Sequence, residues 1–200
     1  MKHPDRTPCL LAATALATCM LLVGCAPLVV GGAAATTAEV AHDRRTAGTV
    51  IDDQAIELKA FRAIHKDKTL ASQSHISVTS YNLNVLLTGE TPTEALRQRA
   101  AEIVRRIPRV RRVYNELVVA GPSSLTSRSN DTLITTKVKL ALFHIKGLKG
   151  FDPTRVKVVT ERGNVYLMGL LTHEEADAVA ETARRVGGVQ RVIKLFEYID

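Results

Sequence analysis

Two stretches of the chain, residues 51–120 and 130–200, repeat the same order of apolar patterns. Each begins with apolar residues at helical spacing, continues with two short runs rich in valine and leucine, and adds a second helical pattern before a last apolar run. A tight turn between the short runs predicts an antiparallel hairpin, and the crossover helix lets the last strand lie parallel to an earlier one. The pattern therefore predicts two α+β units, each helix–strand–strand–helix–strand with a small mixed sheet covered by two helices.

Polar residues indicate where the helices start and where the two units separate. Thr91–Glu94 predicts a capping box with Pro92 at the first helical position, and Thr172–Glu175 predicts a second capping box. Asn130–Asp131 is predicted to cap the first helix of the second unit. Residues 121–129, which are rich in glycine, proline and serine, are predicted to form a linker.

The N-terminal segment has an apolar stretch, Leu10 to Val23, that follows a short basic start. This pattern is typical of a secretory signal peptide, and the stretch is too short to span a bilayer comfortably. The run ending at Cys25 resembles the bacterial lipobox, so residues 1–24 are predicted to be a lipoprotein signal peptide and Cys25 the acylated mature N-terminus. The alternative is an ordinary signal peptide with a chance cysteine. Residues 25–50 are predicted to be a lipidated tether, because they are small and weakly patterned.

An acyl anchor of two or more chains holds a protein durably at a membrane while its body stays in water. Resemblance to bacterial lipoproteins implies that an aspartate after the cysteine would favour the inner membrane. The residue there is Ala26. We therefore expect a lipid-anchored protein on the periplasmic face of the outer membrane.

The composition of the chain limits the classes of partner that it is expected to bind. The formal net charge is +7, and loss of the signal peptide lowers it only by one, so anionic partners are favoured. An exported chain does not meet the genome, and tryptophan is absent, so we expect no nucleic-acid partner. Cys9 and Cys19 leave with the signal peptide, which excludes a disulfide and a free catalytic thiol.

The sequence gives little support for catalysis, and we predict that the protein is not an enzyme. The acidic pairs Asp52–Asp53 and Glu174–Glu175 lie at predicted helix starts, where they favour the helix dipole. His144 and His173 show no metal-ligand spacing, and the sequence contains no nucleophile elbow or phosphate loop. No cofactor and no metal site are expected.

The repeated units resemble the BON domain. In that module a valine-rich hairpin ends in Val-x-Leu-x-Gly, and a capped helix then leads to Gly-Val-x-x-Val. The second unit carries this pattern as Val165–Gly169 and Gly188–Val192, and the first carries it as Val85–Gly89 and Arg109–Asn115. The first unit departs from the pattern at Leu83 and Pro108, where the module usually has glycine. Its hairpin turn and its entry to the third strand are therefore expected to differ.

Two such units behind a lipobox resemble the dual-BON-domain outer-membrane lipoproteins. The resemblance implies a non-catalytic protein that supports outer-membrane integrity and binds anionic phospholipid through its second module. It also implies association with the outer-membrane protein-assembly machinery and with division sites. The alternative is an adaptor that docks assembly or cell-wall remodelling factors.

The predicted helix 131–144 is apolar on two faces. Ile134, Val138, Ala141, Leu142 and Ile145 are predicted to form its inner face. Leu133, Leu140 and Phe143 point away from that face, with Lys137 and Lys139 nearby, which predicts contact with an anionic membrane. The alternative is that the first unit covers this outer face, because Leu58 and Phe61 also leave the inner face of its own first helix.

A second candidate site is a run of arginines at the end of the first unit: Arg105, Arg106, Arg109, Arg111 and Arg112. Cations at a helix C-terminus complement the helix dipole, which is the structural interpretation. The functional interpretation is an anion-binding patch.

Overall fold

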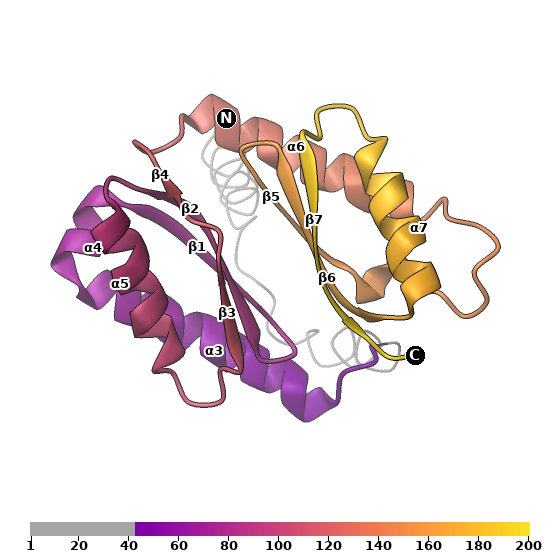
Figure 1. Cartoon of the computed structure of the whole chain (residues 1–200), viewed down its shortest axis with the longest axis horizontal. Coiled ribbons are helices and arrows are strands. Elements are labelled where there is room, and N and C mark those ends of the chain that lie inside the picture. The colour runs from indigo at the N-terminus through magenta and orange to yellow at the C-terminus, as the bar shows by residue number, and fades with distance from the viewer. Residues whose placement is uncertain (1–42) are drawn as a thin grey trace, which may run out of the picture. The chain divides into compact units, whose positions relative to one another are not determined.

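The computed structural model describes residues 43–200, in which two modules of like topology follow one another (Figure 1). The elements of the first module are α3 (Ala47–Lys66), α4 (Lys68–Gln73), β1 (His75–Tyr81), β2 (Asn84–Thr91), α5 (Glu94–Arg105), β3 (Arg112–Asn115) and β4 (Val118–Val119). Those of the second are α6 (Leu125–Leu142), the 3₁₀ turn η1 (Pro153–Arg155), β5 (Lys157–Glu161), β6 (Asn164–Leu171), α7 (His173–Arg184) and β7 (Arg191–Tyr198).

The predicted sheet topology is confirmed in both modules. In the first, β1 pairs antiparallel with β2, and β3 and β4 both pair parallel with β2. In the second, β5 pairs antiparallel with β6 and β7 pairs parallel with β6. The last apolar run of the first module was expected to be one strand, but it divides into β3 and β4 on either side of the buried Leu117.

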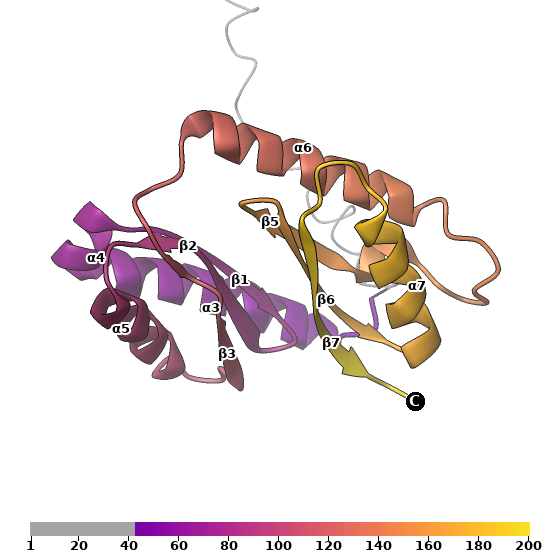
Figure 2. The same ribbon diagram turned by 45° about the horizontal axis from the view of Figure 1, so that its top comes forward.

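Two helices cover one face of each sheet, as predicted (Figures 1 and 2). Beneath α3 and α5 lies a core that includes Ile56, Val85 and Leu87, and beneath α6 and α7 an equivalent core includes Ile134, Val165 and Leu167. Burial of these aliphatic side chains stabilises each module, because every one of them removes apolar surface from water at about 25 cal/mol per Å².

A third core joins the modules and lies on the faces of the sheets that the helices leave uncovered. Tyr81 and Leu86 from the first module pack with Tyr166 and Met168 from the second, and all four are at most 4% exposed. The hydroxyl of Tyr81 also donates to the carbonyl oxygen of Arg155 at 3.0 Å. Contact between the modules is therefore made by the sheets and not by the outer face of α6.

Left-handed backbone at the hairpin turns matches the twist of the strands that they join. Asn82 and Leu83 have φ values of 50° and 66°, and Arg162 and Gly163 have values of 52° and 74°. After the crossover helix, Arg109 has a φ of 75° where the second module has Gly188 at 101°. The expectation that these turns differ between the modules is therefore wrong, because the first module keeps the left-handed conformation without glycine.

Three predicted helix starts are wrong. Helix α3 begins at Ala47 after the N-cap Thr46, so Asp52–Asp53 lies beyond its first turn. The N-cap of α5 is Thr93, whose hydroxyl accepts from the amide of Leu96 at 3.3 Å, so Pro92 precedes the cap and no capping box forms there. Helix α6 begins at Leu125 after the N-cap Ser124, so Asp131 lies within the helix. The capping box at Thr172–Glu175 is confirmed.

The helices also extend into the segments that were predicted to be a linker and a tether. Helix α6 takes up residues 125–129 of the predicted linker, and α3 begins at Ala47 within the predicted tether. Before α3, Arg44 donates to Glu175 of the second module and Arg45 donates to Asp53 of the first. The predicted signal peptide, Cys25 and the remainder of the tether to residue 42 lie outside the described residues.

Candidate functional site

Helix α6 is fixed to its module by one face. Ile134, Val138 and Leu142 are at most 1% exposed, and Ala141 and Ile145 are half-buried, which confirms the predicted inner face. Polar contacts add to this packing, because the hydroxyl of Thr135 donates to that of Thr160 at 2.7 Å. These contacts set the rotation of the helix, so the direction of its outer side chains is determined.

The outer face carries the residues that the sequence predicted for membrane contact. Leu133, Leu140 and Phe143, which we call the α6 stripe, are 58%, 59% and 62% exposed. Lys137 lies between the two leucines along this face, and Lys139 flanks it; both are exposed. The alternative that the first module covers this face is therefore wrong, because the third core lies on the sheets.

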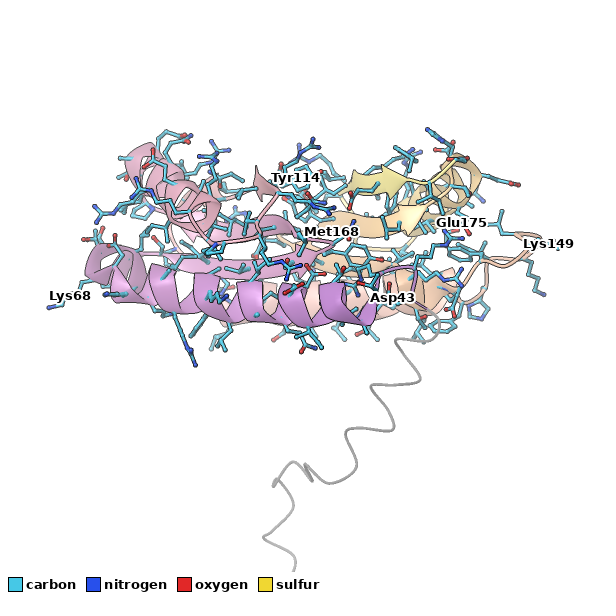
Figure 3. All side chains as sticks on the ribbon, turned by 90° about the horizontal axis from the view of Figure 1, so that it is seen from below. Asp43, Lys68, Tyr114, Lys149, Met168 and Glu175 are labelled. Atoms are coloured by element: carbon cyan, nitrogen blue, oxygen red, sulfur yellow. The ribbon has the colours of Figure 1, made fainter. Side chains whose placement is uncertain are left out.

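The surroundings of the α6 stripe are cationic. From residue 125 to residue 149 the chain has five basic residues and one acid, Asp131, which is buried. Lys149 projects from the loop that follows the helix (Figure 3). Exposed apolar side chains among lysines are the arrangement that inserts into the acyl boundary of an anionic membrane.

A second exposed apolar face lies on the first module. Ile51, Leu58 and Phe61 of α3, which we call the α3 stripe, are 66%, 48% and 53% exposed. Their spacing of seven and then three positions is the same as that of the α6 stripe. The ring of Phe61 lies against that of His65, with 3.9 Å between the centroids. The α3 stripe therefore provides a comparison surface of matched chemistry on the other module.

The arginine cluster is exposed but partly engaged. Arg109 pairs with Asp52 across 2.8 Å, and the guanidinium of Arg112 lies 5.7 Å from the ring centroid of Tyr114. Arg105 occupies the last turn of α5, where a cation complements the helix dipole. These contacts favour the structural interpretation of this cluster.

Among the acidic residues and histidines considered for catalysis, Asp53, Glu175 and His173 have structural partners. Asp53 accepts from the backbone of the first hairpin, and Glu175 closes the capping box of α7. Burial raises the pKa of Glu175, but hydrogen bonds from Arg44 and Thr172 outweigh it and hold that pKa below its ordinary value. His173 bonds to Asp200 at 2.7 Å and stacks on Tyr198. None of these groups converges on a substrate position in the described part of the chain.

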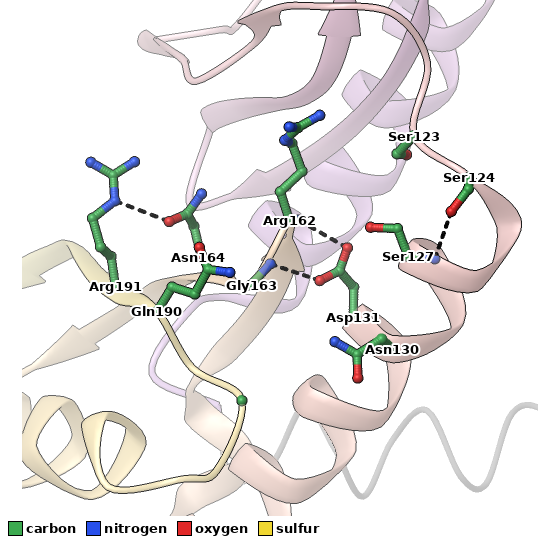
Figure 4. Close-up of a pocket in the computed structure, with 11 residues that line it drawn as sticks. Ser123, Ser124, Ser127, Asn130, Asp131, Arg162, Gly163, Asn164, Gln190 and Arg191 are labelled. Atoms are coloured by element: carbon green, nitrogen blue, oxygen red, sulfur yellow. Dashed lines mark hydrogen bonds between the residues drawn. The ribbon is translucent and has the colours of Figure 1, made fainter.

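A polar hollow of about 600 Å³ lies beside the start of α6 and the second hairpin (Figure 4). Its groups bond mainly to one another: Asp131 accepts from the amides of Arg162 and Gly163, and Arg191 donates to Asn164 at 3.0 Å. This mutual satisfaction gives the hollow a structural role in holding α6 against the hairpin turn.

Sequence reasoning missed a cluster where the modules meet, made of His75 on β1, Glu90 on β2 and Glu161 on β5, which we call the His–Glu cluster. One ligand atom from each residue lies within 4.8 Å of the others. Burial, together with the negative charges of Glu90 and Asp131, raises the pKa of Glu161 to about 7. The available signal was Glu90, an acid in a strand where the second module has Leu170.

Within residues 43–200, no helix is both long enough and apolar enough to cross a bilayer.

Comparison with known proteins matches the BON domain model to residues 52–121 and 130–200. The chain is 38% identical to the outer membrane lipoprotein DolP of Haemophilus influenzae over 185 residues, which cover 92% of this chain and 94% of that protein. It is 38% identical over 157 residues to a 21 kDa hemolysin of Actinobacillus pleuropneumoniae, covering 78% of this chain and 79% of that one.

Among solved structures, the C-terminal domain of CdsD, a structural protein of the type III secretion system of Chlamydia trachomatis, matches 74% of this chain and 67% of that one. Its TM-score of 0.29 and identity of 15% are too low to carry an argument. Two BON modules, together with 38% identity over nearly the full length of both chains, show that this protein belongs to the BON-domain family and, within it, to the DolP outer-membrane lipoproteins.

Proposed function

We propose that the protein is held to the periplasmic face of the outer membrane by an acylated Cys25 and that α6 binds anionic phospholipid. The observation that carries this proposal is the exposure of Leu133, Leu140 and Phe143 on a helix whose other face is fully engaged. Lys137 and Lys139 supply the cations beside these side chains. An exposed apolar stripe costs free energy in water, and a membrane interface removes that cost.

The two contacts differ in strength and therefore in purpose. An acyl anchor holds the chain at the membrane whatever the headgroups are, because each buried methylene contributes about 0.8 kcal/mol. The α6 contact depends on composition, because attraction of a lysine to an anionic surface is worth only about 1 kcal/mol and is screened by salt. The protein would therefore concentrate where anionic lipid is enriched and support the integrity of the envelope there.

A second candidate function is favoured by the α3 stripe. Ile51, Leu58 and Phe61 leave an exposed apolar face on the first module while α6 is at the membrane. A protein of the outer-membrane assembly machinery, or a cell-wall remodelling factor, would be docked there. The adaptor and the phospholipid-binding function use different helices, so variants separate them.

The lipid-binding proposal is tested with residues 43–200, which contain every described helix and strand and lack the anchor. We expect these residues to float with vesicles containing phosphatidylglycerol and not with phosphatidylcholine vesicles. Leu140→Asp with Phe143→Asp should abolish flotation, because two carboxylates replace apolar contacts and are repelled by anionic headgroups. Raising the salt concentration should weaken binding of the unchanged protein.

The matched control is Leu58→Asp with Phe61→Asp, the same pair of changes at the same spacing on α3. We expect this variant to float like the unchanged protein, and thermal melts should show that both variants stay folded. Equal flotation of the α6 variant and the unchanged protein would refute membrane contact through α6. Loss of flotation in the α3 variant alone would move the contact to the first module.

Acylation at Cys25 gives a separate prediction. Cys25→Ala should abolish incorporation of a fatty-acid analogue into the full chain, because a lipobox requires the cysteine sulfur as the acceptor. Metabolic labelling of cells expressing either chain measures this directly. Labelling of the variant at the level of the unchanged chain would show that Cys25 is not the attachment site.

A further inference from the structure

The contact between the two sheets has two ends, and equivalent positions of the two modules occupy them. Tyr81 at the end of β1 corresponds to Glu161 at the end of β5, since they pair with Asn84 and Asn164 respectively. Leu170 and Glu90 correspond as well, because each directly follows the glycine of its middle strand. At these positions one end holds a tyrosine and a leucine, and the other holds two glutamates.

The first of these ends is chemically satisfied. Leu170 is a partly buried member of the third core, and the hydroxyl of Tyr81 donates to the carbonyl oxygen of Arg155 at 3.0 Å. A buried hydroxyl with an acceptor and an aliphatic neighbour leaves no polar group without a partner.

The second end is not satisfied. Glu90 is 0% exposed, and neither of its carboxylate oxygens forms a hydrogen bond with any described residue. His75 Nδ1, also buried and without a hydrogen bond, lies 3.4 Å from Glu90 Oε2. Glu161 is 7% exposed and brings a second carboxylate to the same point. Two buried carboxylates beside an unpartnered imidazole nitrogen are costly unless a cation joins them.

Arg162 compensates this charge only in part. Its Nη1 lies 3.5 Å from Glu90 Oε1, too far for a strong charge-assisted bond, and its side chain is 43% exposed. The guanidinium of Arg162 can therefore rotate into solvent when a metal ion binds Glu90.

We propose that His75, Glu90 and Glu161 bind one divalent transition-metal ion of the zinc type, which joins the two modules. An imidazole nitrogen and carboxylate oxygens are ligands that Zn²⁺ takes at about 2.0–2.2 Å. Ligand atoms at that radius lie roughly 3–4 Å apart, so the present separations need only small side-chain rotations. The imidazole disfavours Ca²⁺ and Mg²⁺, which prefer oxygen ligands alone.

A cavity beside the His–Glu cluster gives a metal ion access from solvent and leaves room for a further ligand. This cavity of about 250 Å³ reaches His75 and Glu161 and is otherwise lined by polar and charged side chains, among them Ser77, Thr135 and Arg128. It gives an ion a path from solvent and leaves room for water as a further ligand. Because His75 and Glu90 belong to the first module and Glu161 to the second, a bound ion crosslinks the modules.

The test uses residues 43–200, which contain no cysteine that could bind zinc. The protein carries no histidine tag, because a tag would itself bind Zn²⁺. Equilibrium dialysis should find one Zn²⁺ per chain, and thermal melts should shift upward with Zn²⁺ but not with Ca²⁺. At a free Zn²⁺ concentration 100 times the dissociation constant, the ratio of folded to unfolded chains should rise about 100-fold. The full chain in detergent should give the same shift.

The ligand variant is Glu90→Leu with Glu161→Tyr. These changes give this end of the contact the residue types that Leu170 and Tyr81 provide at the other end. Replacing buried charges by well-packed apolar groups is often neutral or stabilising, so the variant should fold. Its melt should not respond to Zn²⁺. Arg162→Asn, which suits the left-handed backbone at that position, should instead bind Zn²⁺ more tightly, because it removes the cation that lies nearest Glu90.

The matched control is His173→Gln with Asp200→Asn, which removes an exposed histidine–carboxylate pair elsewhere in the second module. It should bind Zn²⁺ as the unchanged protein does. Absence of any Zn²⁺-dependent shift in the unchanged protein overturns the proposal. A shift that persists in the ligand variant, or that disappears in the control, also overturns it.

Discussion

Alanine in place of Gly89 is expected to destabilise the first module by about 3–5 kcal/mol, which combines overpacking with an unfavourable backbone conformation. Gly89 has a φ of 113°, a region that residues with a Cβ rarely adopt. A Cβ at this position would also lie 2.0 Å from the carbonyl oxygen of His75, on the backbone of the paired strand β1. Neither strand can shift freely, because β2 is buried along its whole length.

Thermal melts of residues 43–200 measure this loss, which corresponds to a fall in Tm of roughly 8–15 °C for a chain of this size. The control is Gly169→Ala at the equivalent position of β6. Gly169 does not have a positive φ, and its added Cβ would meet the Arg155 carbonyl oxygen at 3.2 Å. We expect a much smaller loss there, and equal losses in the two variants would contradict this account.

The order of helices and strands could be predicted because local patterns determine most of it. Valine-rich runs separated by Asn-Leu and by Arg-Gly predicted the two hairpins, and both turns have the left-handed residues that such hairpins need. The capping box at Thr172–Glu175 was also predictable, because all its bonds lie within four residues.

The start of α6 could not be predicted, because aspartate can cap a helix or, from inside a helix, accept hydrogen bonds from a distant turn. An aspartate ahead of an apolar helical pattern is typical of an N-cap. Asp131 instead sits inside the helix and accepts from the amides of the Arg162–Gly163 turn, 31 positions away. Ser124, the true cap, was assigned to the linker, since serine is common in both settings.

The outer face of α6 could also be predicted only in part, because local spacing identifies its residues but contacts between distant segments decide whether they are covered. Helical spacing predicted that Leu133, Leu140 and Phe143 leave the inner face, but it did not indicate what covers them. That depended on the third core, in which Leu86 and Tyr166 pack together from separate modules. Comparison of the repeats would have revealed Glu90 as the counterpart of Leu170, but not that Glu161 lies beside it.

The largest loss of stability from a polar change is expected at Asp53, with a smaller one at the equivalent Asp131. Asp53 is 3% exposed and accepts four bonds, from the hydroxyl of Ser80, the amides of Asn82 and Leu83, and the guanidinium of Arg45. Asp131 accepts two bonds, from the amides of Arg162 and Gly163 in the turn. Each acid therefore ties the first helix of its module to the hairpin turn.

Asparagine has nearly the shape of aspartate but replaces one acceptor oxygen by a donor, so donors in the turn lose their partner. Hydrogen bonds to a charged group contribute about 1.5–3 kcal/mol each. Asp53→Asn loses the bonds of one oxygen, which accepts two, and should cost about 3–4 kcal/mol. Asp131→Asn loses one bond and should cost about 1.5–3 kcal/mol. Urea denaturation of residues 43–200, followed by far-UV circular dichroism, measures both losses.

Hydrogen exchange then identifies the module that opens. Amides of β1 and β2 should lose protection in Asp53→Asn, and those of β5 and β6 in Asp131→Asn, because each acid holds only the hairpin of its own module. The control is Asp52→Asn, which alters an exposed pair with Arg109 and should change stability by no more than about 1 kcal/mol. A loss at Asp131 equal to or greater than that at Asp53 would show that the number of accepted bonds does not set the cost.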